Sequence, residues 1–165
     1  MGIPFTFLRL DWRHLFSCYI LKAETNMPAI NWTFLCDYAF VDRAGRASII
    51  RTFTFIRAPG LPFRYPQIFL ALEYMADRSE DFTLGAMITS PSGKQVAKVE
   101  LNRKAKSTEK GKLEKGVLPL GFYNCKFEEA GEHHVEILIN GQSVHFLPLN
   151  IVVKESKKPP APKSA

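Results

Sequence analysis

The sequence is poor in several features, and each shortage excludes a class of protein. Its 165 residues include only three cysteines and no close-spaced pair, which excludes a disulfide scaffold and an all-cysteine zinc site. No run of about 18 uncharged apolar residues occurs, which excludes a transmembrane helix. Charged residues make up 23% and apolar residues 46%, as in ordinary globular proteins, so wholesale disorder is excluded too. The length predicts one domain with tails.

The net charge of +6 is concentrated in two short segments. Residues 102–116 hold six basic and two acidic residues, and residues 154–165 hold four basic and one acidic. Without 102–116, residues 27–153 hold 9 basic and 11 acidic residues. A broad basic face for nucleic acid is therefore not expected.

The two ends of the chain differ in composition from its middle. Within residues 1–26, apolar side chains at helical spacing are typical of a helix on a membrane surface. Met27, however, directly precedes a segment with strand character. We therefore interpret residues 1–26 as an over-extended start or a disordered extension, with an anchor as the alternative. Residues 154–165 (KESKKPPAPKSA) predict a disordered tail, because they offer little apolar mass for folding. The predicted domain is 27–153.

Short apolar segments separated by turns fill that domain. Residues 67–76 (QIFLALEYMA) fit a buried strand or a short helix, and a strand is favoured because neither end carries a helix cap. Residues 90–93 (SPSG) and Asn140-Gly141 are typical turns, the second being a strong hairpin signal. Residues 59–66 contain three prolines and predict a loop. Strand patterns cover residues 32–41, 46–56, 67–76, 82–89, 95–101, 117–127, 133–139 and 144–153.

About eight strands without a confident helix predict an all-β fold. Hairpin follows hairpin, and the strand–helix alternation that a parallel sheet needs is missing. The expected architecture is an antiparallel two-sheet sandwich, immunoglobulin-like, and the alternative is a closed β-barrel.

Three segments carry a resemblance to a known family. Residues 34–40 (FLCDYAF), the turn at 90–93, and the ending from Gly131 to Asn140-Gly141 together resemble a family of small, uncharacterised bacterial proteins labelled only as a domain of unknown function. The resemblance covers residues 27–153. It implies a β-sandwich fold and a bacterial source, and it implies no activity or site.

The residues offer little for catalysis. Cys36 lies in an apolar, aromatic strand, where a thiol is usually an inert core residue. Cys125 lies near a strand end and is predicted to be partly exposed, so a nucleophile served by a hairpin histidine is only a remote alternative. No serine occupies a G-x-S-x-G elbow and no glycine loop could hold phosphates. We expect no enzyme, no catalytic residue and no cofactor.

The C-terminal hairpin offers the one candidate metal site. A two-residue turn at Asn140-Gly141 pairs Glu136 with His145 and makes His134 their neighbour on the same face. Two imidazoles and a carboxylate are suitable ligands for zinc or iron. The favoured interpretation is a cross-strand pair on a solvated face. His133 then points the other way and is expected to pack in the core or at its rim.

The basic segment 102–116 could bind phosphates with a salt-dependent affinity. It contains no aromatic residue on which bases could stack, so a solvated loop is favoured. An anion-facing module that binds nucleic acid or phospholipid is kept as the second hypothesis. Its candidate residues are Arg103, Lys104, Lys106, Lys110, Lys112 and Lys115.

The proline-held segment 61–66 is the predicted protein-contact loop, because prolines present bulky side chains at low entropic cost. Its candidate residues are Leu61, Phe63, Arg64 and Tyr65.

Asp37, alone among apolar neighbours, needs backbone donors or a basic partner. The leading hypothesis is a non-enzymatic binding module of a bacterial, cytoplasmic protein assembly, whose partner is another protein rather than a small molecule, nucleic acid or membrane.

Overall fold

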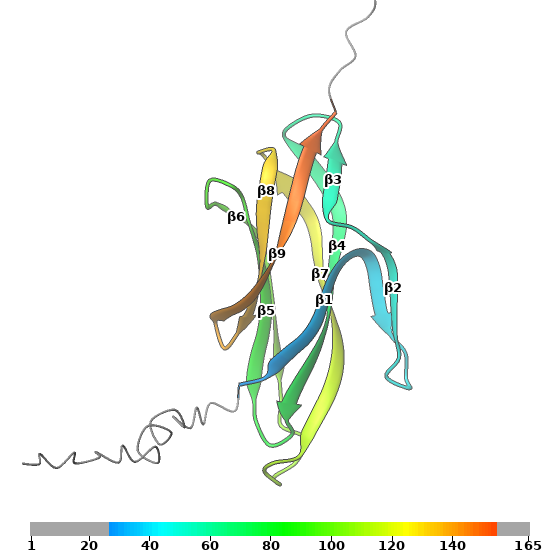
Figure 1. The fold of residues 1–165 in the computed structure, drawn as a ribbon, viewed down its shortest axis with the longest axis vertical. Coiled ribbons are helices and arrows are strands. Elements are labelled where there is room, and N and C mark those ends of the chain that lie inside the picture. The colour runs from blue at the N-terminus through cyan, green and yellow to red at the C-terminus, as the bar shows by residue number, and fades with distance from the viewer. Residues whose placement is uncertain (1–26, 155–165) are drawn as a thin grey trace, which may run out of the picture.

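The structure, a computed structural model, describes residues 27–154, and the predictions for residues 1–26 and 155–165 lie outside them. No helix occurs in the described part, so it contains none that could cross a membrane. Nine strands form the fold (Figure 1): β1 (Ala29–Val41), β2 (Ala47–Thr52), β3 (Phe55–Ala58), β4 (Phe63–Asp77), β5 (Phe82–Thr89), β6 (Gln95–Arg103), β7 (Leu113–Phe127), β8 (Gly131–Ile139) and β9 (Gln142–Val153).

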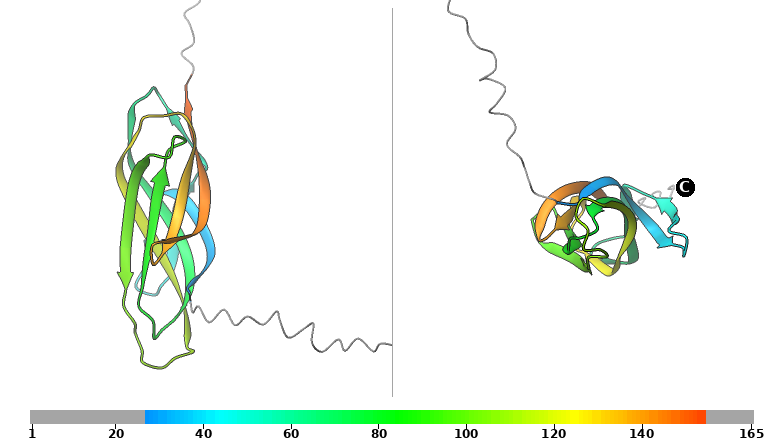
Figure 2. Two further views of the ribbon diagram at one scale, coloured as in Figure 1. Left: turned by 90° about the vertical axis from the view of Figure 1, so that its left-hand side faces the viewer. Right: turned by 90° about the horizontal axis from the view of Figure 1, so that it is seen from below.

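The strands form two packed sheets, which confirms the predicted sandwich. One sheet has the order β2-β1-β4-β7 and the other the order β3-β9-β8-β5-β6. All neighbours pair antiparallel except β3 and β9, which run parallel. Edge strands β6 and β7 approach each other, yet they share no hydrogen-bonded ladder, so the sheets do not close into a barrel. The β1–β2 hairpin stands out from the body in Figures 1 and 2.

The prediction of a single strand over residues 46–56 is wrong, because this segment crosses from one sheet to the other. Arg51 adopts a positive φ of 56°, and β2 ends at Thr52. The backbone N–H of Asn150 in β9 donates to the carbonyl of Thr54 (2.9 Å), which begins the parallel pairing of β3 with β9. This crossing explains why nine strands form instead of about eight.

The core lies between the sheets, and β4 runs through its middle. Ile68, Leu70 and Leu72 of β4 are fully buried in the inter-sheet core. The alternate residues Phe69 and Ala71 are also buried, in a second cluster with Cys36 and Ala39. Residues 67–76 are thus a strand, as predicted, and their continuous apolar run reflects burial on both faces of the sheet.

The C-terminal hairpin turns at Asn140-Gly141, as predicted, and both residues have positive φ (51° and 81°). Asn140 is anchored to β5, because its side-chain Oδ1 accepts from the N–H of Thr83 (2.9 Å) and its own N–H donates to the Thr83 carbonyl (2.8 Å). The register between β8 and β9 shifts by one residue two pairs beyond the turn. Leu138 faces Ser143, but the next residue, Ile137, faces His145. Val144 is the extra residue of this bulge.

Candidate functional site

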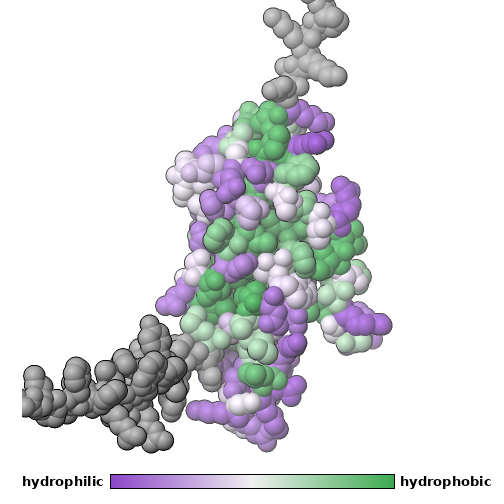
Figure 3. Space-filling view, in the orientation of Figure 1, coloured by the Kyte–Doolittle hydropathy of each residue, from purple (hydrophilic) through white to green (hydrophobic). Residues whose placement is uncertain are grey.

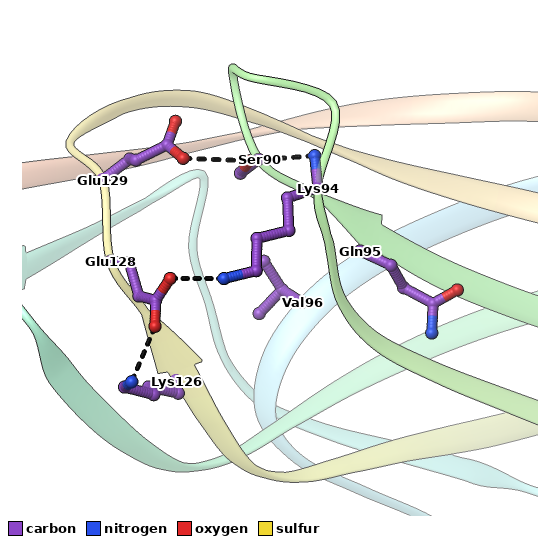
Figure 4. A pocket seen from close by; sticks show the side chains of 7 residues that line it. All are labelled: Ser90, Lys94, Gln95, Val96, Lys126, Glu128 and Glu129. Atoms are coloured by element: carbon purple, nitrogen blue, oxygen red, sulfur yellow. Dashed lines mark hydrogen bonds and ion pairs between the residues drawn. The ribbon is translucent and has the colours of Figure 1, made fainter.

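The end of the sandwich holds a small cavity between the β5–β6 and β7–β8 turns (Figure 4). Glu128 forms ion pairs with Lys94 and Lys126, each at 2.6 Å, and these cations lower the pKa of Glu128 to about 2. Glu129 accepts from the N–H (3.2 Å) and hydroxyl (2.6 Å) of Ser92, which lowers its pKa as well. Because every charge at this cavity has a partner, we interpret it as a clamp between two turns rather than as a binding site.

His133 is the buried histidine that its position in β8 predicts. Its side chain is 0% exposed and packs edge-on against Phe127, with ring centroids 5.1 Å apart. Its Nδ1 lies 3.3 Å from the carbonyl oxygen of Gly131, whereas Nε2 has no hydrogen-bond partner in the described part of the chain. Burial lowers the pKa of His133, so the ring is held in its neutral form.

The metal hypothesis fails on the geometry of the hairpin. The bulge at Val144 changes the predicted register, so that Glu136 faces Phe146 and His145 faces Ile137. His134 packs its ring against Phe146 instead (centroids 6.0 Å apart). Among residues 27–154, no three His, Cys, Asp or Glu side chains lie close enough to hold a metal ion. The structure therefore does not bring His134, Glu136 and His145 together.

The predicted basic loop is shorter than 102–116, since Arg103 ends β6 and Leu113 begins β7. Most of its cations face carboxylates. Arg103 contacts the buried carboxylate of Glu114, and Lys106 lies 3.4 Å from the same group. Lys104 pairs with Asp81 and Lys112 with Glu109. The backbone N–H groups of Ser79 and Gly111 donate to the Asp77 carboxylate and lower its pKa, and the charge of Lys110 adds to this lowering. Lys115 is exposed on β7.

The predicted contact segment 61–66 is not a free loop throughout. Leu61 is exposed, but Phe63, Arg64 and Tyr65 form the first residues of β4 and pair with β7. Phe63 stacks on Phe127 (ring centroids 5.4 Å apart), which makes it part of the core rim. Of the four candidate residues, only Leu61 and Arg64 are exposed, so they offer a small contact surface.

Asp37 has the partners that its apolar surroundings require. Its carboxylate pairs with Arg51 (2.9 Å) and accepts from the hydroxyl of Tyr65 (3.2 Å). Arg51, Tyr65 and Asp37 line one side of a shallow pocket between β2 and β3. We interpret Asp37 as a structural anchor that holds the base of the projecting hairpin to β4.

Both described cysteines are buried thiols. Cys36 is 0% exposed on the outer side of the four-stranded sheet, and Cys125 is 2% exposed in the inter-sheet core. The prediction that Cys125 is partly exposed is wrong, because Asn124 has a positive φ (53°) and the next side chain packs into the core. Burial raises the pKa of Cys125 to about 11 and also raises that of Cys36, so neither thiol is activated.

The surface that the sequence did not reveal is the outer face of the four-stranded sheet. Phe69 lies between two rings, Tyr38 at 5.1 Å and Tyr123 at 5.9 Å between centroids. Tyr38 also contacts Phe40, and Phe34 contacts Trp32. We name this surface the aromatic face; its residues are Trp32, Phe34, Tyr38, Phe40, Phe69 and Tyr123. In Figure 3, hydrophobic residues gather over β1 and β2.

The signal for this face was present but ambiguous. The even-numbered residues from Trp32 to Phe40 are aromatic or Cys36, while the odd-numbered residues include Leu35. Leu35 packs in the inter-sheet core, so the aromatic side points outward. Because both sides of the strand are apolar, alternation alone could not decide which side faces solvent.

The strand order defines the class of protein. In an immunoglobulin constant domain, strands A, B and E are neighbours in one sheet and strands C, F and G in the other. Here β1, β4 and β7 take the first set of places and β5, β8 and β9 the second. The domain is an immunoglobulin-like sandwich. Within this class, the chain belongs to the Family of unknown function (DUF6941), which matches residues 31–152 and confirms the family resemblance noted from the sequence.

Two solved structures resemble the chain at low identity. An immunoglobulin-like protein from Pseudomonas aeruginosa is 12% identical, with a TM-score of 0.40 over 75% of this chain and 95% of that one. The Pseudomonas fluorescens alkylpurine DNA glycosylase AlkC, bound to DNA containing an abasic site analogue, is 10% identical, with a TM-score of 0.42 over 76% of this chain. The chain spans 30% of that glycosylase's length. Among curated proteins, none matches this chain in sequence.

Proposed function

We propose that this domain works by contact with protein, as an interaction module in the bacterial cytoplasm, and that the aromatic face is its contact surface. The observation that carries the proposal is the exposure of aromatic side chains that no described strand covers. Phe34, Tyr38 and Phe40 are 43–46% exposed, and Tyr123 is 63% exposed. Phe34, Tyr38 and Tyr123 lie on one sheet, and Phe40 continues their row on the projecting part of β1, so the rings are not scattered over the surface.

The chemistry of the face suits a protein partner. Tyr and Phe are enriched in the buried centres of protein interfaces, because each ring contributes a large contact area with few rotatable bonds. The side chains around Phe69 carry no formal charge, since its neighbours on the face are Tyr38, Tyr123, Ala71 and Gly121. A phosphate backbone or an acidic lipid surface would find no cation there, so the face favours protein over anionic partners.

The anion-facing alternative has less support than the protein-contact proposal. Its affinity would depend on cations that are free to meet phosphates, yet four of its six candidates face carboxylates of the domain itself. Those pairs would have to open before the cations could bind a phosphate. The exposed residues Leu61 and Arg64 lie just before and at the start of β4 and could add only a rim to a protein contact.

Photo-crosslinking in cells tests the proposal. p-Benzoylphenylalanine is introduced at Phe40 on the aromatic face and, as the matched control, at Phe146 on the other sheet, where the native ring is 61% exposed. We expect discrete protein adducts from position 40 and none of comparable yield from position 146. Equal adducts from both positions, or none from position 40, would contradict the proposed contact surface.

A further inference from the structure

The aromatic face adjoins an arm, the part of the β1–β2 hairpin beyond Asp37, with which no third strand of the described domain pairs. The β1–β2 hairpin leaves the body of the sandwich, as Figure 1 and the right-hand view of Figure 2 show. In the described part of the chain, β2 is hydrogen-bonded to β1 alone. The projecting part carries exposed Phe40 and Ile50, at 43% and 46% exposure. A two-stranded hairpin is marginally stable on its own, so this arm calls for a surface that packs against it.

We infer that the occupant of this surface is a second copy of this chain, which packs its own aromatic face and arm against the first. The inference rests on the proposed function and names the partner. A twofold axis would place the arm of each copy over the sheet face of the other, so that one set of residues satisfies both sides. This arrangement covers Phe40 and Ile50 together with Tyr38 and Tyr123.

The charge of the surface favours a copy of itself. The residues of the aromatic face are uncharged. Two charged groups lie at its margins: the pair Asp37 with Arg51 at the base of the arm, and Glu73, which is the cross-strand neighbour of Trp32. Two copies that meet over the uncharged centre around Phe69 desolvate no like charges there, whereas a charged partner would lose hydration without gaining an ion pair.

The exposed area is sufficient for a dimer. A fully buried aromatic side chain removes about 150–250 Å² from solvent, so the exposed parts of Phe34, Tyr38, Phe40 and Tyr123 amount to roughly 400 Å². With Ile50 and the neighbouring backbone, two copies would bury about 1,000 Å² in total, which is the size at which specific interfaces begin. Interfaces at this lower end of the size range are typical of weak or transient complexes.

Tyr123 shapes the face for close approach. Its ring lies over Gly121, where an added Cβ would sit only 2.9 Å from the tyrosine hydroxyl oxygen. The glycine therefore lets the ring lie flat against the sheet, edge-on to Phe69. A flat ring leaves a smooth surface that a second sheet can cover at the usual distance of about 10 Å.

Sedimentation velocity of the full chain at concentrations up to about 100 µM tests the inference. We expect a concentration-dependent dimer. The double variant Phe40→Ser/Tyr123→Ser should weaken it at least about 30-fold, because central aromatic residues dominate such interfaces. The matched control Leu101→Ser/Phe146→Ser changes side chains of equal exposure on the other sheet, 43% and 61%, and should keep the dimer.

Separate measurements establish whether the variants are folded and which protein the aromatic face contacts. Circular dichroism and the urea midpoint establish that each variant is folded, and crosslinking from position 40 in the otherwise unchanged chain gives the mass of the adduct. An adduct of twice the chain mass supports the second copy. A monomer at all concentrations, or a dimer that survives the double variant, overturns the inference. An adduct with a different protein also overturns it, yet leaves the proposed function standing.

Discussion

At the scale of single residues, the buried ring of His133 makes the stability of the fold depend on pH. The ring is fully buried, its Nε2 has no partner within residues 27–154, and the titratable groups that face it are Glu129 and His134. Burial holds its pKa below the ordinary value, so an unfolded chain binds a proton at this position before the folded chain does. Acid therefore favours unfolding: the stability contributed by neutral His133 is complete above about pH 7 and is lost as the pH falls below about 6.5.

We predict that His133→Phe removes this pH dependence. The difference in unfolding free energy between the native chain and the variant should shift by up to about 1.4 kcal/mol per pH unit below pH 6.5, in favour of the variant. Urea denaturation at pH 7.5 and pH 5.0 measures it. His145→Gln, at an exposed position, is the control and should follow the native chain. A difference between native chain and His133→Phe that stays constant with pH would refute this role.

At the scale of elements, Glu114 joins three segments of the chain. Its carboxylate in β7 contacts Arg103 of β6, and Arg78 and Lys106 each lie 3.4 Å away. Arg103 also donates to the hydroxyl of Tyr74 in β4 (3.1 Å). Because β6 and β7 are the edges of different sheets, this cluster links the two sheets where no backbone ladder does.

Glu114→Gln should destabilise the domain by about 3–5 kcal/mol, because it leaves several cations around a buried neutral amide. The matched control is Glu109→Gln, which removes a carboxylate from an exposed pair with Lys112 and should change stability by less than about 1 kcal/mol. Urea unfolding monitored by tryptophan fluorescence compares the two. Equal effects would mean that the buried cluster does not hold the sheets together.

The strands and turns could be predicted from the sequence, whereas the contacts between strands could not. Local patterns determine the strands and the Asn140-Gly141 turn, since alternation and turn chemistry act over a few residues. The bulge at Val144 depends on how β8 and β9 settle in the whole sheet, and it moved Glu136 away from His145. The pairing of Arg103 with Glu114 is likewise a tertiary contact. The aromatic face escaped prediction because a strand that is apolar on both sides does not indicate which side is covered.

At the scale of the whole molecule, the two described cysteines lie in different layers. Cys125 is in the inter-sheet core, while Cys36 is under the aromatic face, where its thiol lies 3.6 Å from the carbonyl oxygen of Phe69. A thiol reagent needs an exposed thiolate, and burial denies both exposure and ionisation to these two side chains. Labelling of either one therefore reports an opening of the layer around it.

We expect both thiols of a Cys18→Ser chain to react with a disulfide reagent at least about a thousandfold more slowly than the urea-unfolded chain, and with the same dependence on urea. Equal dependence follows if the outer cluster and the inter-sheet core open together, because β4 contributes Phe69 to one and Leu70 to the other. Cys36→Ser and Cys125→Ser variants assign the two rates. Faster labelling at Cys36 would contradict a single cooperative unit and would mean that the β1–β2 arm opens separately from the sandwich.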